Sequence, residues 1–479
     1  MIGKKRWKKP RLKVFIVDSL KKIIKAESEP EKNHNLRKDV NREDFDGAEK
    51  SSIRILLLLP FVFYLSATIA FADVADTENG GSISGDVFGK NNRWYHLFLS
   101  ISEVYSDNIF NTNENRESDF VTDIRPGIRV TIPESDQSAE KLITSSDIAG
   151  GRVFQRLNLT SSRRFKAYAE YAPQFHYYSQ NKDENTVDQQ VQGGLQFSLL
   201  DGLAFDVVDL YTETYDRSQA DIVPQDDRYC SNLLTFTAAY PISERFNLRV
   251  DYANFHVTYF DGEKNGFRNR TDNAGTGYLF FKIKSKTAVY FKYQHTDIQY
   301  ENTIDRDGDE RDMLAGFTWD FSAKTNLNFQ AGYGIRHYDE PSYDDGNSFI
   351  CQLNTRYQFS DKTMLELMAY QQNGESPETI YEYTTTTGAS IKVTQILRPK
   401  LTFEFDAAYN QFDYRAGNEK MEGISGRIDN YFLFSPSCSY SFRKWLSVSL
   451  TLAHHQRLSE IDEDSYLGST VAFKLTGAI

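Results

Sequence analysis

Cysteine is scarce in this chain of 479 residues, which contains only Cys230, Cys351 and Cys438. Their number is odd, and they are too far apart to form a zinc or redox motif. An oxidising periplasm would permit one long-range disulfide. Free thiols within strands are the simpler expectation.

Long apolar runs are equally rare, because only Ile55 to Phe71 forms one. A mean hydropathy of −0.55 with 40% hydrophobic residues is too polar for a helical membrane protein. Aromatic residues nevertheless make up 14% of the chain, which is rich for a soluble globule. A transmembrane β-barrel reconciles these facts, because only half of each strand faces lipid and aromatic girdles mark both interfaces.

Catalytic motifs are absent too. The chain has neither a Gly-x-Ser-x-Gly elbow nor a His-Glu-x-x-His metalloprotease motif. The adjacent His454 and His455 would project to opposite faces of a strand, so they could not bind one metal ion together. The sequence therefore predicts no enzyme and no cofactor. A hydrolase site built across strands and a purely structural barrel remain as alternatives.

One short motif resembles part of a calcium loop. Asp305, Asp307 and Asp309 alternate around Gly308, and carboxylates at alternate positions are typical calcium ligands. The terminal bidentate glutamate of the full twelve-residue loop is missing. A solvated turn is the simpler interpretation, with weak divalent binding as the alternative.

The apolar run has the features of a signal peptide. Arg54 precedes it, and Ala70-Phe71-Ala72 provides small residues at the −3 and −1 positions of a cleavage site. We therefore expect a signal peptide over residues 54–72, with a single transmembrane anchor as the alternative. No cysteine follows the site, which argues against a lipoprotein anchor.

The remaining segments follow from this prediction. Residues 1–53 are expected to be a non-structural extension, or the product of a translation start assigned too far upstream. Residues 73–90 are rich in Gly, Asp and Ser, which predicts a flexible periplasmic lead-in. The barrel is then expected over residues 91–479.

Cleavage would make the mature chain strongly acidic. Residues 1–72 hold 16 Lys+Arg and 9 Asp+Glu, which leaves 39 against 58 and a net charge near −19. This charge disfavours nucleic acid as a partner. It suits a cell surface whose acidic loops face water or bind divalent cations.

An alternating pattern of apolar and polar residues begins near residue 160, and the run 401–410 shows it best. The odd-numbered positions of this run are apolar: Leu401, Phe403, Phe405, Ala407 and Tyr409. The even-numbered positions are mostly polar: Thr402, Glu404, Asp406, Ala408 and Asn410. Successive strand side chains point to opposite faces, so the run has one apolar and one charged face. Repetition of this pattern along the chain favours a barrel in lipid with water inside, against a large soluble sandwich.

Short turns recur about every 40 residues and alternate with longer acidic connections, so the hairpin is the repeating unit. The sequence predicts an all-β transmembrane antiparallel up-and-down β-barrel of about 18 strands. Short turns in the periplasm and an even strand number would place both termini there. The predicted strands are 93–104, 119–132, 164–178, 186–199, 203–214, 227–240, 246–260, 268–283, 287–300, 310–322, 326–338, 347–360, 363–373, 380–396, 401–414, 426–441, 444–456 and 465–478.

The polar parity should face the lumen, because a charge in the middle of the lipid face costs about 2–4 kcal/mol. Phe291 is predicted to face lipid, so a lysine there should impair insertion. Lys292 is predicted to face water, so a charge reversal there should leave folding nearly intact. The lumen-facing candidates are Lys166, Glu170, Arg249, Asp251, Lys292, Gln294, Gln330, Arg336, Glu404 and Asp406.

One connection does not fit the pattern. Residues 133–163 join two strands where a short turn is expected, and they are far too long for one. Three interpretations are open: a disordered excursion, an extra hairpin, or a segment folded into the lumen as a constriction.

The stretch Ser102 to Gly127 resembles the opening hairpin of the putative beta-barrel porin-2 family and of related outer-membrane proteins of exopolysaccharide and PEP-CTERM systems. The matching residues are Tyr105, Asp107, Asn108, Ile109, Phe110, Ser118, Asp119, Phe120, Pro126 and Gly127. The resemblance implies a location in the outer membrane of a Gram-negative cell. It implies a channel associated with exopolysaccharide, and a porin for small polar solutes is the alternative.

The resemblance also implies partners: outer-membrane lipid, the barrel-insertion machinery, and a polar solute or polysaccharide. Barrels of this kind usually end in an aromatic residue that the insertion machinery recognises. This chain ends in Ile479 after a strand that carries Phe473 and Leu475 on the same parity. The insertion signal is therefore expected to be weaker than usual.

Overall fold

The computed structural model describes most of the chain from Trp94 onwards. The described residues are 94–133, 142, 144–152, 164–200, 202–215, 228–262, 265–301, 306–322, 324–341, 343, 345–416 and 426–478. The expected extension, signal peptide and lead-in, residues 1–90, lie outside them. Among the described residues, no helix is both long and apolar enough to cross a membrane.

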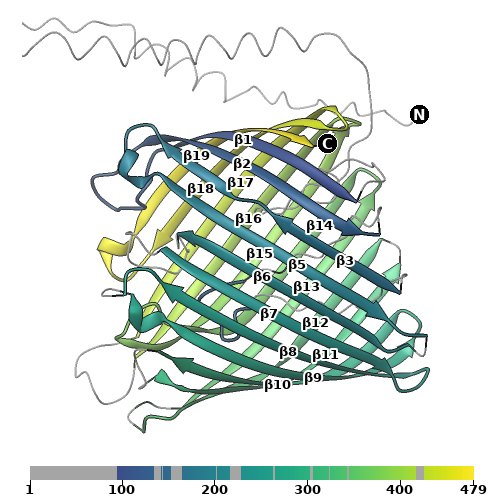
Figure 1. Ribbon diagram of the computed structural model, residues 1–479. Helices are drawn as coiled ribbons and strands as arrows, with labels where there is room; N and C mark the ends of the chain where they lie inside the picture. The colour runs from purple at the N-terminus through teal and green to yellow at the C-terminus, as the bar shows by residue number, and fades with distance from the viewer. Residues whose placement is uncertain are drawn as a thin grey trace, which may run out of the picture. The chain divides into compact units, whose positions relative to one another are not determined.

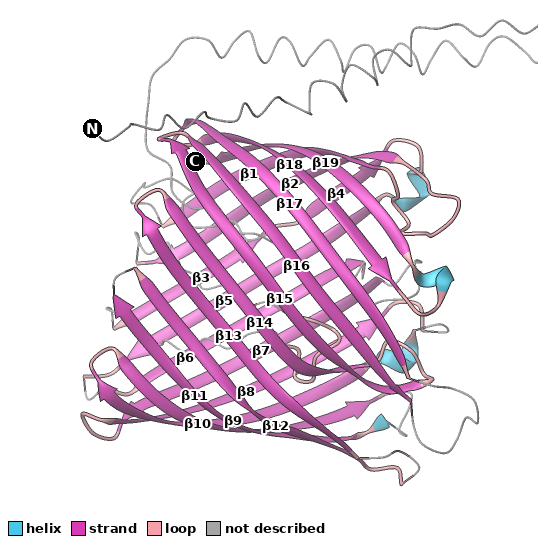
Figure 2. Ribbon diagram, turned by 180° about the vertical axis from the view of Figure 1, so that it is seen from behind, coloured by secondary structure: helices cyan, strands magenta, loops and turns pink. Residues whose placement is uncertain are grey.

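The described residues form one antiparallel sheet that closes into a barrel (Figure 1). Its strands are β1 (Tyr95–Ser106), β2 (Asp119–Ile132), β3 (Phe165–Tyr171), β4 (Gln174–Tyr178), β5 (Thr186–Ser198), β6 (Ala204–Tyr215), β7 (Arg228–Pro241), β8 (Phe246–Tyr259), β9 (Arg270–Lys284), β10 (Thr287–Tyr300), β11 (Gly308–Ser322), β12 (Thr325–Tyr338), β13 (Gly346–Ser360), β14 (Thr363–Glu375), β15 (Tyr381–Arg398), β16 (Leu401–Ala416), β17 (Arg427–Arg443), β18 (Leu446–Leu458) and β19 (Tyr466–Ala478). Figure 2 shows that the helical turns are confined to connections. Those whose bounds fall within the described residues are η1 (Lys182–Glu184), η2 (Gly266–Arg268) and η4 (Asp462–Asp464).

β3 and β4 are two halves of one barrel strand. Both pair with β2 on one side and with β5 on the other. The break falls at Ala172-Pro173, where proline has no N–H to donate to the ladder. The barrel therefore has 18 strands around its wall, which confirms the predicted fold and number.

The first and last strands close the barrel. β1 pairs with β19 from Phe98 opposite Ala478 to Ser106 opposite Thr470. Closure joins the two end strands, so the backbone groups at this seam are paired even where lipid offers no hydrogen bonds. In Figure 1 the purple β1 runs beside the yellow β19.

The residues that carry the family resemblance reinforce this seam. The backbone N–H of Ser469 donates to Asp107 Oδ1 at 2.6 Å, and Asn108 Nδ2 donates to the carbonyl of Leu467 at 3.1 Å. Asn108 also accepts from the N–H of Thr112, which shapes the β1–β2 connection. The motif therefore fastens the opening hairpin to the last strand.

Connections at the two ends of the barrel differ in length. We call one end the short-turn end; there β1 begins, β19 ends, and Ser-x-Lys-Thr turns recur. In two of these turns the serine hydroxyl accepts a backbone N–H, from Lys324 at 3.0 Å and from Lys362 at 3.2 Å. We call the other end the long-connection end, because longer segments such as 260–269 and 459–465 join the strands there.

Exposed apolar side chains cover much of the outer face of the wall. Phe291 is 52% exposed and Val250 is 49% exposed, while their inward neighbours are buried. Aromatic side chains pair across strands on this face, as Phe246 and Phe281 do with ring centroids 5.1 Å apart. Such a face is stable in lipid and would be unfavourable in water.

Candidate functional site in the barrel lumen

The predicted inward positions are distributed around the inner wall. Seven are buried and three are half-buried: Lys166, Arg249, Asp251, Lys292, Gln330, Arg336 and Glu404, then Glu170, Gln294 and Asp406. Lys292, Gln294 and Gln330 line one cavity. Lys166, Glu170, Glu404 and Asp406 do not line that cavity, and Glu404 lies 3.8 Å from Lys392.

Part of the long connection 133–163 lies inside the barrel. Of the three interpretations of its sequence, this agrees with a segment folded into the lumen. We call its described residues, 142 and 144–152, the inner segment. Its ends approach one another through an antiparallel bridge between Thr144 and Arg152. The segment appears in blue within the barrel in Figure 1.

An apolar patch on the inner wall receives this segment. Val208, Leu233 and Phe255 are almost fully buried although they occupy inward positions. Leu142 packs in the same cluster. Gly151 sits so close that a Cβ there would lie 2.1 Å from the ring of Phe255. An apolar patch facing open water would be costly, so its cover by the inner segment explains its composition.

Charged groups fix the inner segment to the same wall. Arg152 lies 3.5 Å from Asp251, and the Gly150 N–H donates to Asp272 Oδ2 at 2.9 Å. The carbonyl of Ile148 accepts from Arg270 at 3.2 Å. Both wall carboxylates are buried, so these contacts are shielded from water and from salt.

A second element enters the lumen from the wall. Pairing between β13 and β14 stops at Cys351 opposite Gln371, whereas pairing between β14 and β15 continues to Glu375 opposite Tyr383. The tip of this hairpin therefore leaves β13 and turns inward. We call residues 373–385 the inward hairpin.

Glu375 holds the inward hairpin in place. Its carboxylate accepts a bidentate pair of hydrogen bonds from Arg336, at 2.8 and 3.2 Å, and another from the hydroxyl of Tyr300. Arg306 donates to the carbonyl oxygens of Ser376 and Glu382, both at 3.2 Å. Bidentate arginine–carboxylate pairs are strong and directional, so they define one position for the hairpin.

The inner segment and the inward hairpin meet. The Glu375 N–H donates to the carbonyl of Asp147 at 2.6 Å. A Cβ on Gly374 would lie 2.7 Å from that same oxygen. Asp147 also lies 3.6 Å from Arg268, in the β8–β9 connection. The two elements thus form a bridge from β9 to β14 at the long-connection end of the lumen.

A third cluster of charges lies beside the hairpin. Asp429 accepts from Arg427 at 2.9 Å and from Arg457 at 2.6 Å. Arg427 also lies 2.9 Å from Asp464 and 3.4 Å from Glu378 at the hairpin tip. Burial raises the pKa of Glu378 to about 7, and the charge of Arg427 opposes that rise.

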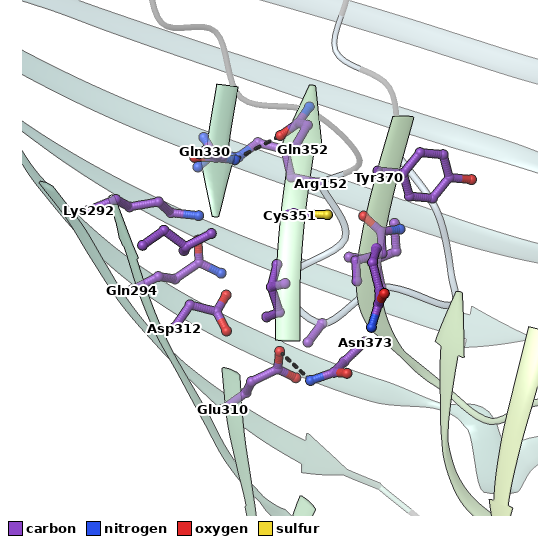
Figure 3. Close-up of a pocket in the computed structure, with 16 residues that line it drawn as sticks. Arg152, Lys292, Gln294, Glu310, Asp312, Gln330, Cys351, Gln352, Tyr370 and Asn373 are labelled. Atoms are coloured by element: carbon purple, nitrogen blue, oxygen red, sulfur yellow. Dashed lines mark hydrogen bonds between the residues drawn. The ribbon is translucent and has the colours of Figure 1, made fainter. Parts of the chain in front are cut away.

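A cavity opens between the inner segment and the wall formed by β10 to β14 (Figure 3). In Figure 3 Lys292, Gln294 and Asp312 point into a space that Asn373 approaches from the opposite side. The space measures about 660 Å³ with its open mouth included. Its polar lining consists of Arg152, Lys292, Gln294, Glu310, Asp312, Gln330, Gln352, Tyr370, Gln371, Gln372 and Asn373.

The acidic loop that resembled a calcium site has other contacts. Asp307 accepts the backbone N–H of Tyr300 at 2.7 Å, and Asp309 lies 2.7 Å from Arg311. Asp305 lies outside the described residues. Within the described part of the chain, no three His, Cys, Asp or Glu residues are placed to hold a metal ion. Cys230, Cys351 and Cys438 are free.

Sequence reasoning left the inner segment as one of three alternatives and named Asp251 and Arg336 as inward residues, but it missed the inward hairpin and its anchor Glu375. Two signals were available. The motif Arg-x-Asp occurs at 249–251, 270–272 and 427–429, and each places a buried ion pair on the inner face. In addition, several inward positions of β6 to β8, such as Val208, Leu233 and Phe255, are apolar, which is unexpected for a wall that faces water.

Comparisons with known proteins agree with this architecture. The family model described as "Putative beta-barrel porin 2" matches residues 98–478. A search of curated proteins found no match.

Solved structures resemble the chain only distantly. "Bacterial polysaccharide outer membrane secretin" shares 7% identity at a TM-score of 0.32, covering 81% of this chain and 99% of that one. OpdK from Pseudomonas aeruginosa, solved with vanillate, shares 8% identity at a TM-score of 0.40, covering 80% and 99%. OccAB4 from Acinetobacter baumannii shares 8% identity at 0.39, covering 81% and 100%.

Proposed function

We propose that the chain, which belongs to the putative beta-barrel porin 2 family, is a restricted channel for polar solutes. Membership of this family makes the chain an outer-membrane β-barrel of the porin type. The solutes that pass through the barrel and the way in which it restricts them are what we propose. The observation that carries it is the contrast between an apolar outer face and an inner wall lined with carboxamides and charged groups. Such a lining supports water and polar solutes and gives no path for lipid.

The restriction follows from the two inward elements. The inner segment contacts β8 and β9 on one side and the inward hairpin on the other. A solute must pass beside this bridge or displace it. We therefore propose a channel that selects by size and hydrogen bonding, with the bridge as its narrow part.

The proposal includes an orientation. The barrel begins and ends at the short-turn end, and in outer-membrane barrels short turns face the periplasm. We propose that both ends of the barrel face the periplasm and that a signal peptide over residues 54–72 directs export. The expected barrel-insertion machinery would then assemble the chain.

A role in exopolysaccharide export is the second candidate. The carboxamides of the cavity favour it, because amides form paired hydrogen bonds with neighbouring hydroxyl groups. A polymer would need a continuous path, so this role requires the bridge to move. Small polar solutes need only a narrow path beside the bridge, so the observed packing favours them over a polymer.

Single-channel recording in planar bilayers tests the channel. We expect the folded full-length protein to conduct in discrete steps, with a larger step when the bridge is released. A folded protein that never conducts, even with the bridge released, would overturn the proposal. A lipid- or peptide-hydrolysing activity abolished by one Ser or His substitution would favour an enzyme.

A deletion strain separates the two cargoes. We expect it to keep its extracellular polysaccharide and to take up small polar solutes more slowly. Loss of polysaccharide with unchanged uptake of small solutes would favour the export role.

A further inference from the structure

We propose that the cavity between the inner segment and β10–β14 is a binding subsite for a neutral saccharide unit. This inference rests on the proposed channel for its physiological role, because the cavity lies in the proposed solute path. Its binding chemistry stands on the lining of the cavity alone. The enclosed part of the cavity measures about 80 Å³ and the space widens to about 660 Å³ when the open mouth is included, so a sugar ring would sit at the mouth.

Carboxamide side chains dominate the polar lining. Five glutamines and one asparagine surround the cavity: Gln294, Gln330, Gln352, Gln371, Gln372 and Asn373. Each carboxamide offers two donated protons and an accepting oxygen in one plane. Two neighbouring hydroxyl groups of a sugar, each both donor and acceptor, match that arrangement.

Several of these groups retain hydrogen-bonding capacity. Gln330 Nε2 donates to Gln352 Oε1 at 2.8 Å, which leaves the amide nitrogen of Gln352 without a partner in the described part of the chain. The side chain of Gln372 likewise forms no hydrogen bond with described residues, whereas the side chain of the adjacent Gln371 projects to the opposite face of β14. These amides are available to a ligand at no cost in broken protein contacts.

A buried acceptor also faces the cavity. Asp312 is only 8% exposed, and its Oδ1 has no hydrogen-bond partner among the described residues. A buried carboxylate oxygen without a donor is costly. A ligand hydroxyl that donates to it would remove that cost. Figure 3 shows Asp312 directed into the space.

The balance of charge favours a neutral ligand. Side chains of both signs line the cavity, namely Lys292 and Arg152 against Glu310 and Asp312, and Arg152 and Glu310 also lie near Asp251 and Arg336 of the wall. A net charge on the ligand would therefore be repelled by one pair as it is attracted by the other. Tyr370, Leu314 and Ile350 add apolar surface, which suits the C–H faces of a pyranose ring.

Equilibrium binding to the full chain, refolded in detergent micelles, tests this site without reference to conduction. Maltose is the neutral probe, and arginine and glutamate are the charged probes, each followed by titration calorimetry. We expect saturable binding of maltose and weaker binding of both charged probes. Gln352→Ala and Gln372→Ala should each weaken maltose binding about three- to tenfold, the effect of one hydrogen bond.

Gln196→Ala is the matched control. Gln196 occupies an inward position of β5, between the exposed Leu195 and Phe197, and does not line the cavity. Its substitution should leave maltose binding unchanged. Tighter binding of a charged probe, no saturable maltose binding by folded protein, or equal weakening by Gln196→Ala would each overturn the subsite.

Binding and conduction can fail separately. A protein that binds maltose with the expected variant pattern but never conducts would keep the subsite and refute the channel. A protein that conducts but binds no maltose would keep the channel and refute the subsite.

Discussion

The two ends of the lumen are built differently. At the long-connection end, Arg306, Arg336 and Arg457 are 1–2% exposed, and each contacts buried acceptors. At the short-turn end, the side chain of the inward Arg356 is 51% exposed although it pairs with Glu366. The same chemistry, an arginine beside a carboxylate, is therefore buried at one end and open to water at the other. Control of passage is expected where the charges are buried.

Removal of Arg336 should have the largest effect. Arg336→Ala leaves the buried carboxylate of Glu375 without its main partner, and breaking a buried pair in this way costs about 3–5 kcal/mol. Arg356→Ala at the other end should cost at most about 1 kcal/mol, because water screens that pair. Thermal unfolding in detergent, followed by circular dichroism, measures both. Equal losses would remove the distinction between the two ends.

The two faces of one strand give the next largest effect. Phe291→Lys places a charge on the lipid face and should cost about 2–4 kcal/mol near the middle of the membrane. Lys292 points into the lumen as parity predicts, but it is 5% exposed and close to Asp312 instead of open to water. Lys292→Glu would add a carboxylate beside Asp312, so we now expect it to impair folding as well.

Lys292→Met separates burial from charge. It keeps the length of the side chain without adding a negative charge, so it should fold better than Phe291→Lys. Heat-modifiable migration on a gel reports assembly of each variant. Efficient assembly of Phe291→Lys together with failure of Lys292→Met would mean that the faces are exchanged.

The wall of the barrel could be predicted almost completely from the sequence. Lipid penalises a charge on one face of every strand, so the period of two is imposed on each segment independently. Strands such as Thr287–Tyr300 and Asp119–Ile132 were therefore placed with the bounds that the structure has. Periodicity did not reveal the break at Pro173.

The contents of the lumen could not be predicted in the same way. The contacts that fix the inward hairpin join residues far apart in the sequence, such as Arg336 and Glu375. Parity states that a side chain points inward but not what it meets there. For the connection that contains the inner segment, the sequence left three alternatives, because its length excluded only a short turn. The apolar inward positions Leu233 and Phe255 would have favoured the third.

Displacement of the inner segment tests whether the bridge restricts the channel. Gly151 has φ +67°, and a Cβ there would clash with the ring of Phe255. Gly151→Val combines that clash with a backbone strain of about 1–3 kcal/mol. We expect the segment to leave its site and the single-channel conductance to rise. Gly262→Val is the control, because no atom lies within 4 Å of its Cβ position. An unchanged conductance in Gly151→Val would show that the segment does not restrict the path.

The smallest effect concerns pH at the tip of the inward hairpin. Burial raises the pKa of Glu378 from 4.5 to about 7 in the folded protein. The folded state then binds more protons than the unfolded state between about pH 4.5 and 7, so stability should fall as the pH rises through that window. Full linkage over that window would amount to about 3 kcal/mol. Solvent reaches the partly exposed Glu378 and screens the effect, so we expect a loss on the order of 1 kcal/mol, which Glu378→Gln should abolish.

Unfolding of both proteins across that pH range provides the measurement. Arg427 and Asp464, which contact the same cluster, remain in the variant, so the difference between the two curves isolates Glu378. Parallel curves would mean that Glu378 titrates as it does in water. The hairpin tip would then be open to solvent, and burial would be confined to the arginines beneath it.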